Sequence, residues 1–112
     1  MNYAGLPGHR DHAPVQKYMN GRASGIVSFG PEAADGLAAG ARFQDALQLF
    51  TRLVNIGDAK SLACHPASTT HRQLNAEELE RAGVRTEMVR LSLGIEHIDD
   101  LQADLEQALG KV

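Results

Sequence analysis

Apolar residues recur with a helical period in two long stretches of the chain. From Ala34 to Leu53 they fall three and four positions apart, which predicts a helix that covers a neighbour with one face. Its stripe comprises Phe43, Ala46, Leu47 and Phe50. The glycine and alanine residues that begin this stretch, GLAAGA, permit close packing against that neighbour. A second amphipathic helix is expected from His97 to Leu109.

Two shorter helices are predicted from signals at their ends. Residues 9 to 19 have helical apolar spacing, and Pro14 is compatible with a helix there only in its first turn. Asn75 precedes Glu78 by three positions, a reciprocal pairing that satisfies free amide groups at a helix start, and Gly83 supplies a left-handed stop. The segment between them is mostly polar, so we expect this helix on the surface.

Three stretches have the character of strands. Residues 24 to 29 are β-branched and apolar, and Leu53–Asn55 forms a short apolar run that ends before a glycine turn. From Met88 to Leu93 two kinds of residue alternate, so that Arg90 and Ser92 lie on the face opposite the leucines.

Helices therefore alternate with short strands, and this order predicts an α/β (α+β) fold in which helices pack on a small sheet. Periodicity alone leaves the strand directions open. We expect one domain over residues 1–112, with a lead-in and short helix over 1–23 and a compact α/β domain over 24–112. A chain of 112 residues can bury a core of its own.

Composition limits the classes of function. The formal charge is only −3 and the basic residues are scattered, which argues against a nucleic-acid or anionic membrane surface. No apolar run is long enough for a membrane span, and MNYAGLPGHR lacks the features of a signal peptide. The single cysteine, Cys64, excludes an internal disulfide and fits a reducing cytoplasm.

Arg90 is the most informative polar residue of the predicted strands. A guanidinium inside an otherwise apolar strand needs an anionic or carbonyl partner, because an unpaired buried charge is costly. That partner is either an external anion or an internal carboxylate, Glu87 or Glu96, and spacing favours neither. Asn55, which precedes a glycine turn, is by itself typical of turn chemistry.

Nucleophilic and metal chemistry are both disfavoured. Cys64 beside His65, and Ser68 near His71, are only sequence neighbours, and no glycine-rich nucleophile elbow surrounds them. The spacing of the histidines matches no common metal site, and one cysteine cannot build a zinc knuckle. The five histidines are His9, His12, His65, His71 and His97.

Two long strings, VNIGDAKSLACHPASTTH and VRLSLGIEHIDDLQADLEQAL, resemble the C-terminal domain of the pyridoxal-phosphate enzymes of cysteine and methionine metabolism. NYAGLP, HRDH and GIVSFG resemble the start of that domain, so the resemblance covers nearly the whole chain. The VNIGD form is similar to the O-acetylhomoserine sulfhydrylases, whose relatives usually have serine at the position of Asn55. Pro14 and Cys64 depart from the family pattern, and we interpret Cys64 as a small core residue.

The resemblance implies a small, mostly antiparallel sheet with helices packed on it, as in the small domain of fold-type I enzymes. It also implies that Arg90 holds the α-carboxylate of an amino-acid substrate, that Asn55 adds a contact, and that Thr70 supports the site's hydrogen bonds. The implied reaction of the full-length enzyme is a γ-replacement in methionine biosynthesis, in which O-acetylhomoserine loses acetate and sulfide adds to give homocysteine.

The same resemblance implies that pyridoxal 5'-phosphate is bound by a larger N-terminal domain, in an enzyme that is typically a homotetramer. Lys17, Lys60 and Lys111 do not occur in the contexts that the family uses for the cofactor lysine. We therefore expect no catalytic, cofactor-binding or metal-binding residue in this chain, no bound cofactor, and no activity from the chain alone. The alternatives are the same domain of a cystathionine γ-synthase or methionine γ-lyase, or a non-catalytic folded module.

Overall fold

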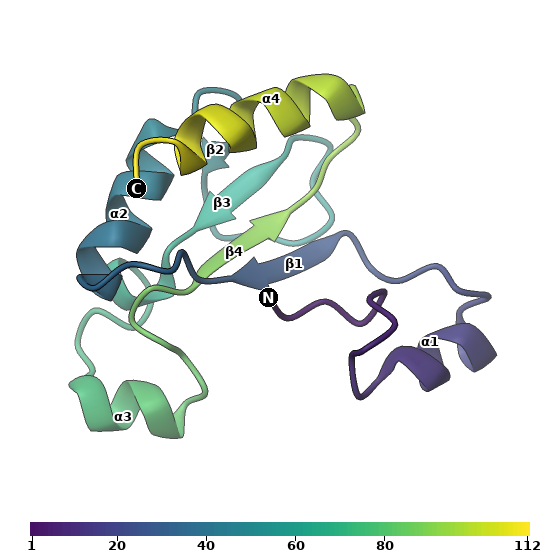
Figure 1. Cartoon of the computed structure of the whole chain (residues 1–112), viewed down its shortest axis with the longest axis horizontal. Coiled ribbons are helices and arrows are strands. Elements are labelled where there is room, and N and C mark those ends of the chain that lie inside the picture. The colour runs from purple at the N-terminus through teal and green to yellow at the C-terminus, as the bar shows by residue number, and fades with distance from the viewer.

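Four short strands pair into one sheet in the order β1-β4-β3-β2 (Figure 1). The computed structural model describes all residues from Met1 to Val112. Strand β4 pairs antiparallel with both β1 and β3, whereas β2 runs parallel to β3. The sheet is therefore mixed but mostly antiparallel, as the family resemblance implied. The strands are β1 (Ile26–Phe29), β2 (Thr51–Arg52), β3 (Leu62–Cys64) and β4 (Val89–Ser92).

Two helices, α2 (Gly36–Ala46) and α4 (Ile98–Leu109), cover one face of the sheet (Figure 1). The alternation of β4 places Val89 and Leu91 on that face, where they join side chains from both helices in the main hydrophobic core. The core comprises Phe43, Phe50, Ala63, Val89, Leu91, Leu101 and Ala108. Arg90 therefore projects from the opposite face, as the two-residue period predicted.

The C-terminal end of α2 differs from the prediction. The apolar period continues to Phe50, but the helix ends at Ala46 and Leu47 is extended. The buried carboxylate of Asp104 accepts the backbone N–H groups of residues 48, 49 and 50, which would otherwise continue the helical ladder. Gln107 Nε2 donates to the Ala46 carbonyl oxygen at 2.7 Å. Two side chains of α4 thus end α2, while Phe50 still reaches the core.

The strand predicted at residues 53–55 is also misplaced. Thr51 and Arg52 are the residues that pair with β3, and the chain then leaves the edge of the sheet. Strand β3 had no counterpart in the sequence prediction, because three apolar residues show no period. Residues 53–61 join these two parallel strands without a helix.

The remaining helices begin and end close to their predicted limits. Helix α1 (His12–Tyr18) accommodates Pro14 in its first turn. Helix α3 (Ala76–Arg81) has the full capping box between Asn75 and Glu78. Gly83 follows it with a φ angle of 71°, in the left-handed region. A short 3-10 helix, η1 (Pro66–Ser68), follows β3.

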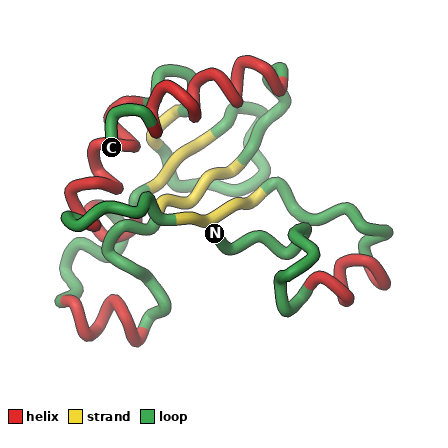
Figure 2. The backbone as a smooth tube through the Cα atoms, viewed as in Figure 1, coloured by secondary structure: helices red, strands yellow, loops and turns green.

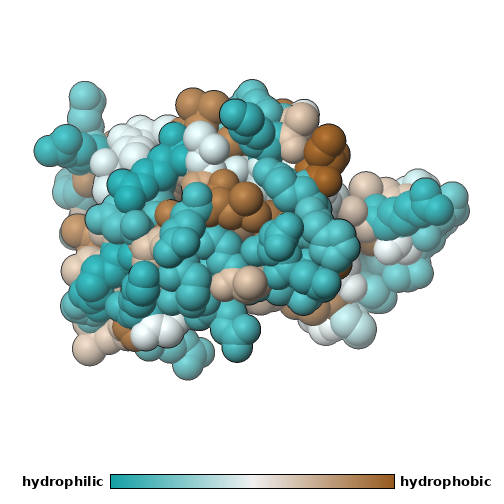
Figure 3. All heavy atoms as spheres, turned by 90° about the horizontal axis from the view of Figure 1, so that it is seen from above, coloured by the Kyte–Doolittle hydropathy of each residue, from teal (hydrophilic) through white to brown (hydrophobic).

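The first 23 residues form an arm that carries α1 away from the sheet (Figure 2). The arm is tied to β1 by an antiparallel bridge between Asn2 and Ser28. Seen over the helical side in Figure 3, most of the surface is hydrophilic and hydrophobic side chains gather only in small groups. No helix has the length and apolar character needed to cross a lipid bilayer.

Candidate functional site

Arg90 lies at the centre of the sheet face that the two long helices leave open. It stands on β4, with Ser28 of β1 on one side and Cys64 of β3 on the other. One guanidinium nitrogen, Nη2, donates to the Asn55 carbonyl oxygen at 3.2 Å. The Nε atom is shielded from solvent and has no hydrogen-bond partner. Arg90 therefore has donor capacity that the chain itself does not use.

The structure excludes an ion pair between Arg90 and Glu87 or Glu96, which is the internal alternative that the sequence leaves open. The carboxylate of Glu87 pairs with Arg85 and accepts from the hydroxyl of Thr86. Glu96 bonds to Ser61 instead of reaching Arg90. Arg90 consequently has a carbonyl partner but no counter-ion within the chain, so its guanidinium is free to pair with an external anion.

Asn55 has the turn role that its position before a glycine suggests, and its main chain also contacts Arg90. Its side-chain Oδ1 accepts the N–H of Ile56 at 2.9 Å, so part of the side chain stabilises the local turn. Its backbone carbonyl is the group that contacts Arg90. The amide nitrogen of Asn55 makes no hydrogen bond within the chain, and the residue is exposed. That nitrogen is available to donate to a ligand beside Arg90.

Thr70 is not in direct contact with either of these residues. Its hydroxyl lies 2.8 Å from Nδ1 of His71, and both groups belong to the loop after η1. The structure thus brings together Arg90 and Asn55 of the three predicted site residues, and places Thr70 in a separate hydrogen bond.

Ser61 and Glu96 form a polar cluster near this site that the sequence did not indicate. The fully buried Ser61 donates its N–H to Glu96 Oε1 at 2.7 Å and its hydroxyl to Oε2 at 2.8 Å. The backbone N–H of Ser61, together with the backbone N–H of Glu96 and the Ser61 hydroxyl, lowers the pKa of Glu96 below its ordinary value. The sequence indicates Glu96 only as a candidate partner of Arg90, because one-dimensional spacing does not show which backbone amides a carboxylate meets.

Ser68 and His65 are in contact, although their surroundings do not suit a nucleophile. His65 is fully buried, and its Nε2 donates to the Thr86 carbonyl oxygen at 2.8 Å. Its Nδ1 lies 2.9 Å from the hydroxyl of Ser68, which also donates to the His65 carbonyl oxygen at 3.3 Å. The backbone amides of Ser68 and Thr69 already donate to carbonyls within the 3-10 turn, so neither can stabilise an oxyanion. We interpret this pair as a structural connection between η1 and the segment before β4.

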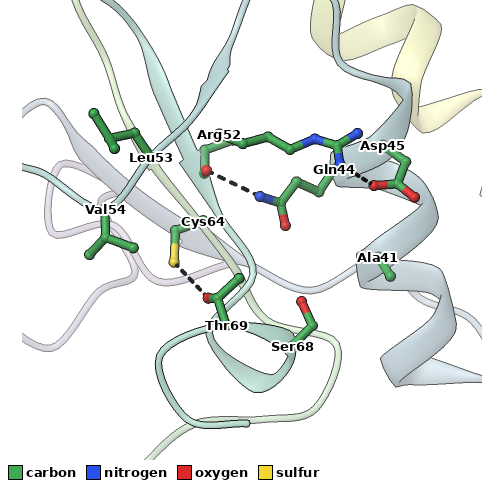
Figure 4. Close-up of a pocket in the computed structure, with 10 residues that line it drawn as sticks. Ala41, Gln44, Asp45, Arg52, Leu53, Val54, Cys64, Ser68 and Thr69 are labelled. Atoms are coloured by element: carbon green, nitrogen blue, oxygen red, sulfur yellow. Dashed lines mark hydrogen bonds and ion pairs between the residues drawn. The ribbon is translucent and has the colours of Figure 1, made fainter.

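The largest hollow, of about 440 Å³, lies beside β2 rather than at Arg90 (Figure 4). Its charged groups are already paired, since Arg52 Nη1 lies 2.8 Å from Asp45 Oδ1. Gln44, which also lines it, donates to the Ala63 carbonyl oxygen. Cys64 points into the hollow with its Sγ 3.5 Å from the hydroxyl of Thr69. The polar groups of this hollow are already paired, so they have fewer free hydrogen-bond donors for a ligand than the guanidinium of Arg90 has. We therefore place the candidate site at Arg90.

The domain is thus a small mixed sheet that presents, on its open face, an arginine without a counter-ion. The chain belongs to the family of Cys/Met metabolism PLP-dependent enzymes, whose model matches residues 1–110. Its members depend on pyridoxal phosphate.

Relatives with different activities align with almost the whole chain. It is 50% identical over 109 residues to O-acetyl-L-homoserine sulfhydrylase 1 of Thermus thermophilus, covering 97% of this chain and 25% of that protein. It is 45% identical over 109 residues to L-methionine gamma-lyase of Pseudomonas putida, covering 97% of this chain and 27% of that protein. The chain therefore spans about a quarter of the length of these curated relatives, and it matches their C-terminal part.

A solved structure from Campylobacter jejuni, assigned as an O-acetylhomoserine (thiol)-lyase, superposes with a TM-score of 0.83 at 44% identity. The alignment covers 97% of this chain and 25% of that one. That structure contains the cofactor joined to a lysine, as pyridoxyl-lysine monophosphate.

The residues of this chain do not form a site for the cofactor. A pyridoxal-phosphate site needs a lysine within reach of the reacting centre and donors for the phosphate. Lys17, Lys60 and Lys111 are all exposed, and none lines any of the five main hollows of the structure. No three histidine, cysteine or carboxylate side chains lie close enough together to hold a metal ion.

Proposed function

We propose that this chain is the substrate-carboxylate-binding domain of an O-acetylhomoserine sulfhydrylase, an enzyme of methionine biosynthesis. The observation that supports this most directly is that Arg90 has no counter-ion in the chain. Similarity to the Thermus enzyme supports the α-carboxylate of O-acetylhomoserine as the anion. Asn55 is the proposed second contact, and Thr70 is a proposed site residue that acts through the loop after η1.

The chemical contribution of the domain is orientation. A guanidinium holds a planar carboxylate through two parallel N–H bonds, which fixes the direction of the substrate's Cα bonds. The cofactor, when bound to the larger part of the enzyme, supplies the electron sink. In the proposed reaction the Cγ–O bond to acetate breaks, a Cγ–S bond to sulfide forms, and the products are homocysteine and acetate. The groups that bind the cofactor belong to the larger part, so we expect the isolated chain to be inactive.

A second candidate is the corresponding domain of a methionine γ-lyase, which the 45% identity to the Pseudomonas putida enzyme favours. A carboxylate anchor at Arg90 suits both enzymes, because both substrates are α-amino acids. Asn55 supports the sulfhydrylase, since the VNIGD form resembles that subfamily. We expect the full-length enzyme to be a cytoplasmic homotetramer.

A hybrid enzyme tests the proposal. In it, this chain replaces the matched C-terminal quarter of the Thermus thermophilus sulfhydrylase, to which it is 50% identical. Homocysteine is measured after addition of O-acetylhomoserine and sulfide, and 2-oxobutanoate is measured after addition of methionine. We expect homocysteine as the main product.

Several outcomes would contradict the proposal. A folded hybrid with bound cofactor that forms no homocysteine argues against the sulfhydrylase. A hybrid that releases 2-oxobutanoate from methionine faster than it forms homocysteine from O-acetylhomoserine favours the γ-lyase. Homocysteine formed by the unfused 112-residue chain with added cofactor would refute the claim that the chain is inactive alone.

A further inference from the structure

The segment that contains Asn55 is attached to β4 and its continuation at two separate points. The first is the contact between Arg90 and the Asn55 carbonyl oxygen. The second lies where residues 94–96, just beyond β4, meet residues 59–61, just before β3. The contacts form a closed ring from Arg90 along the chain to Glu96, across to Ser61, and back through Asn55.

Hydrogen bonds at the second point are numerous and short. Glu96 accepts both the N–H and the hydroxyl of Ser61. The hydroxyl in turn accepts the N–H of Gly94 at 2.8 Å, and the N–H of Ile95 donates to the Ala59 carbonyl oxygen at 3.0 Å. A side chain at position 94 would overlap the Ala59 carbonyl oxygen, so the two backbones approach as closely as glycine allows. We call the set of Ser61, Gly94 and Glu96 the clasp.

Two consecutive turns join the clasp to Asn55. Asp58 Oδ1 accepts the N–H of Lys60 at 3.0 Å, which closes a turn directly before Ser61. Gly57, with a φ of 76°, makes the turn before it. The position of Asn55 therefore depends on where the clasp fixes Ser61.

We propose that Glu96 is a positioning residue for the carboxylate site: through Ser61 it fixes segment 53–61, and so holds Asn55 against Arg90. This inference rests on the proposed function for its effect on substrate, but the positioning itself is a property of the chain. Glu96 does not touch the ligand. It determines where Asn55 stands and, through the Asn55 carbonyl, how the guanidinium of Arg90 is oriented.

The test compares Glu96→Gln with Glu106→Gln, which changes an exposed carboxylate on α4. Ser61→Ala is a milder second variant, because it removes the hydroxyl and leaves the Glu96 carboxylate and the Ser61 N–H. In the 112-residue chain, NMR follows hydrogen exchange of the hydrogen-bonded amides of Ile56, Lys60 and Ser61 and the Nε–H resonance of Arg90. We expect at least about tenfold faster exchange and a shifted Arg90 resonance in both clasp variants, with neither change in Glu106→Gln. Unchanged exchange together with an unchanged Arg90 resonance would overturn the proposal.

The second measurement uses the hybrid enzyme and two inhibitors, homoserine and 3-aminopropanol, which is homoserine without its carboxylate. We expect Glu96→Gln to reduce the preference for homoserine over 3-aminopropanol about tenfold. It should also raise KM for O-acetylhomoserine more than it lowers kcat. General destabilisation would instead weaken the binding of both inhibitors equally. An equal loss of affinity for homoserine and for 3-aminopropanol would overturn the positioning role of Glu96. If the unmutated hybrid does not prefer homoserine, the proposed function fails, while the exchange measurement still decides the role of Glu96.

Discussion

The guanidinium of Arg90 contacts the main chain of Asn55, not its side chain: Nη2 lies 3.2 Å from the Asn55 carbonyl oxygen. This separates two properties of position 55. Orientation of the guanidinium depends on where the backbone runs, while the free amide nitrogen depends on which side chain is present. A substitution can therefore remove the second property and preserve the first.

Replacement of Asn55 by serine should leave Arg90 in place and weaken substrate binding only modestly. The side chain of Asn55 is exposed, so the free energy of unfolding should change by no more than about 0.5 kcal/mol. Serine keeps a hydroxyl donor on a shorter side chain, and this displacement of the donor should raise KM for O-acetylhomoserine about threefold to tenfold in the hybrid enzyme. The Arg90 Nε–H resonance serves as the control for position, and a large shift in it would show that the side chain also orients the guanidinium.

Gly40→Ala should destabilise the chain by about 1–3 kcal/mol. A Cβ at this position would lie 2.5 Å from Nε2 of the buried His65 and 3.0 Å from the carbonyl oxygen of Glu87. Displacement of the imidazole would also break its bonds to Ser68 and Thr86. Urea unfolding measures the effect, with Gly8→Ala as the matched control because a Cβ at position 8 meets nothing within 4 Å. Equal midpoints would show that α2 does not pack as closely as the structure indicates.

Asp104→Asn should cost about 2 kcal/mol of stability. The carboxylate is only 6% exposed and accepts three backbone amides, whereas an asparagine has one oxygen and would direct an N–H₂ group at one of those donors. Asp100→Asn, on the exposed side of the same helix, should leave the unfolding midpoint nearly unchanged. A similar loss in both variants would indicate a general charge effect on α4.

Acid should destabilise the chain through Asp104 and Glu96. Burial raises the pKa of Asp104, but the N–H groups of Gln48 and Leu49, the Gln107 amide and the Phe50 N–H outweigh it and lower that pKa below its ordinary 3.8. A lowered folded-state pKa contributes stability above the unfolded value, and this contribution is lost as pH falls through the folded value. Unfolding free energy should therefore decline from about pH 5 downward. Asp104→Asn should flatten this decline, and an unaltered slope would contradict the assignment.

Prediction from the sequence was most successful where local signals determine the structure. The capping box at Asn75, the left-handed Gly83 and the alternation around Arg90 were all confirmed, because each depends on neighbours within a few residues. Close packing by the glycine-rich start of α2 was confirmed by the contact that Gly40 makes with His65.

Errors arose where a distant side chain competes with the local pattern. The early end of α2 is due to Asp104, more than fifty positions away, and no period in residues 34–53 could reveal it. The clasp is hidden for the same reason, since Ser61 and Glu96 are 35 positions apart. The cost of an unpaired charge shows only that Arg90 needs a partner, and its role as a substrate-binding residue is implied by the family resemblance; the structure then excludes Glu87 and Glu96 as its partners.

The central claim is that Arg90 anchors the substrate carboxylate, and the KM of the hybrid enzyme for O-acetylhomoserine tests it most directly. Arg90→Lys keeps the charge but removes the two-pronged geometry, which should raise KM about thirtyfold, corresponding to about 2 kcal/mol. Arg52→Lys, on the edge strand β2 and paired with Asp45, is the matched control and should leave KM unchanged. A KM for Arg90→Lys equal to that of the unmutated hybrid would contradict the claim.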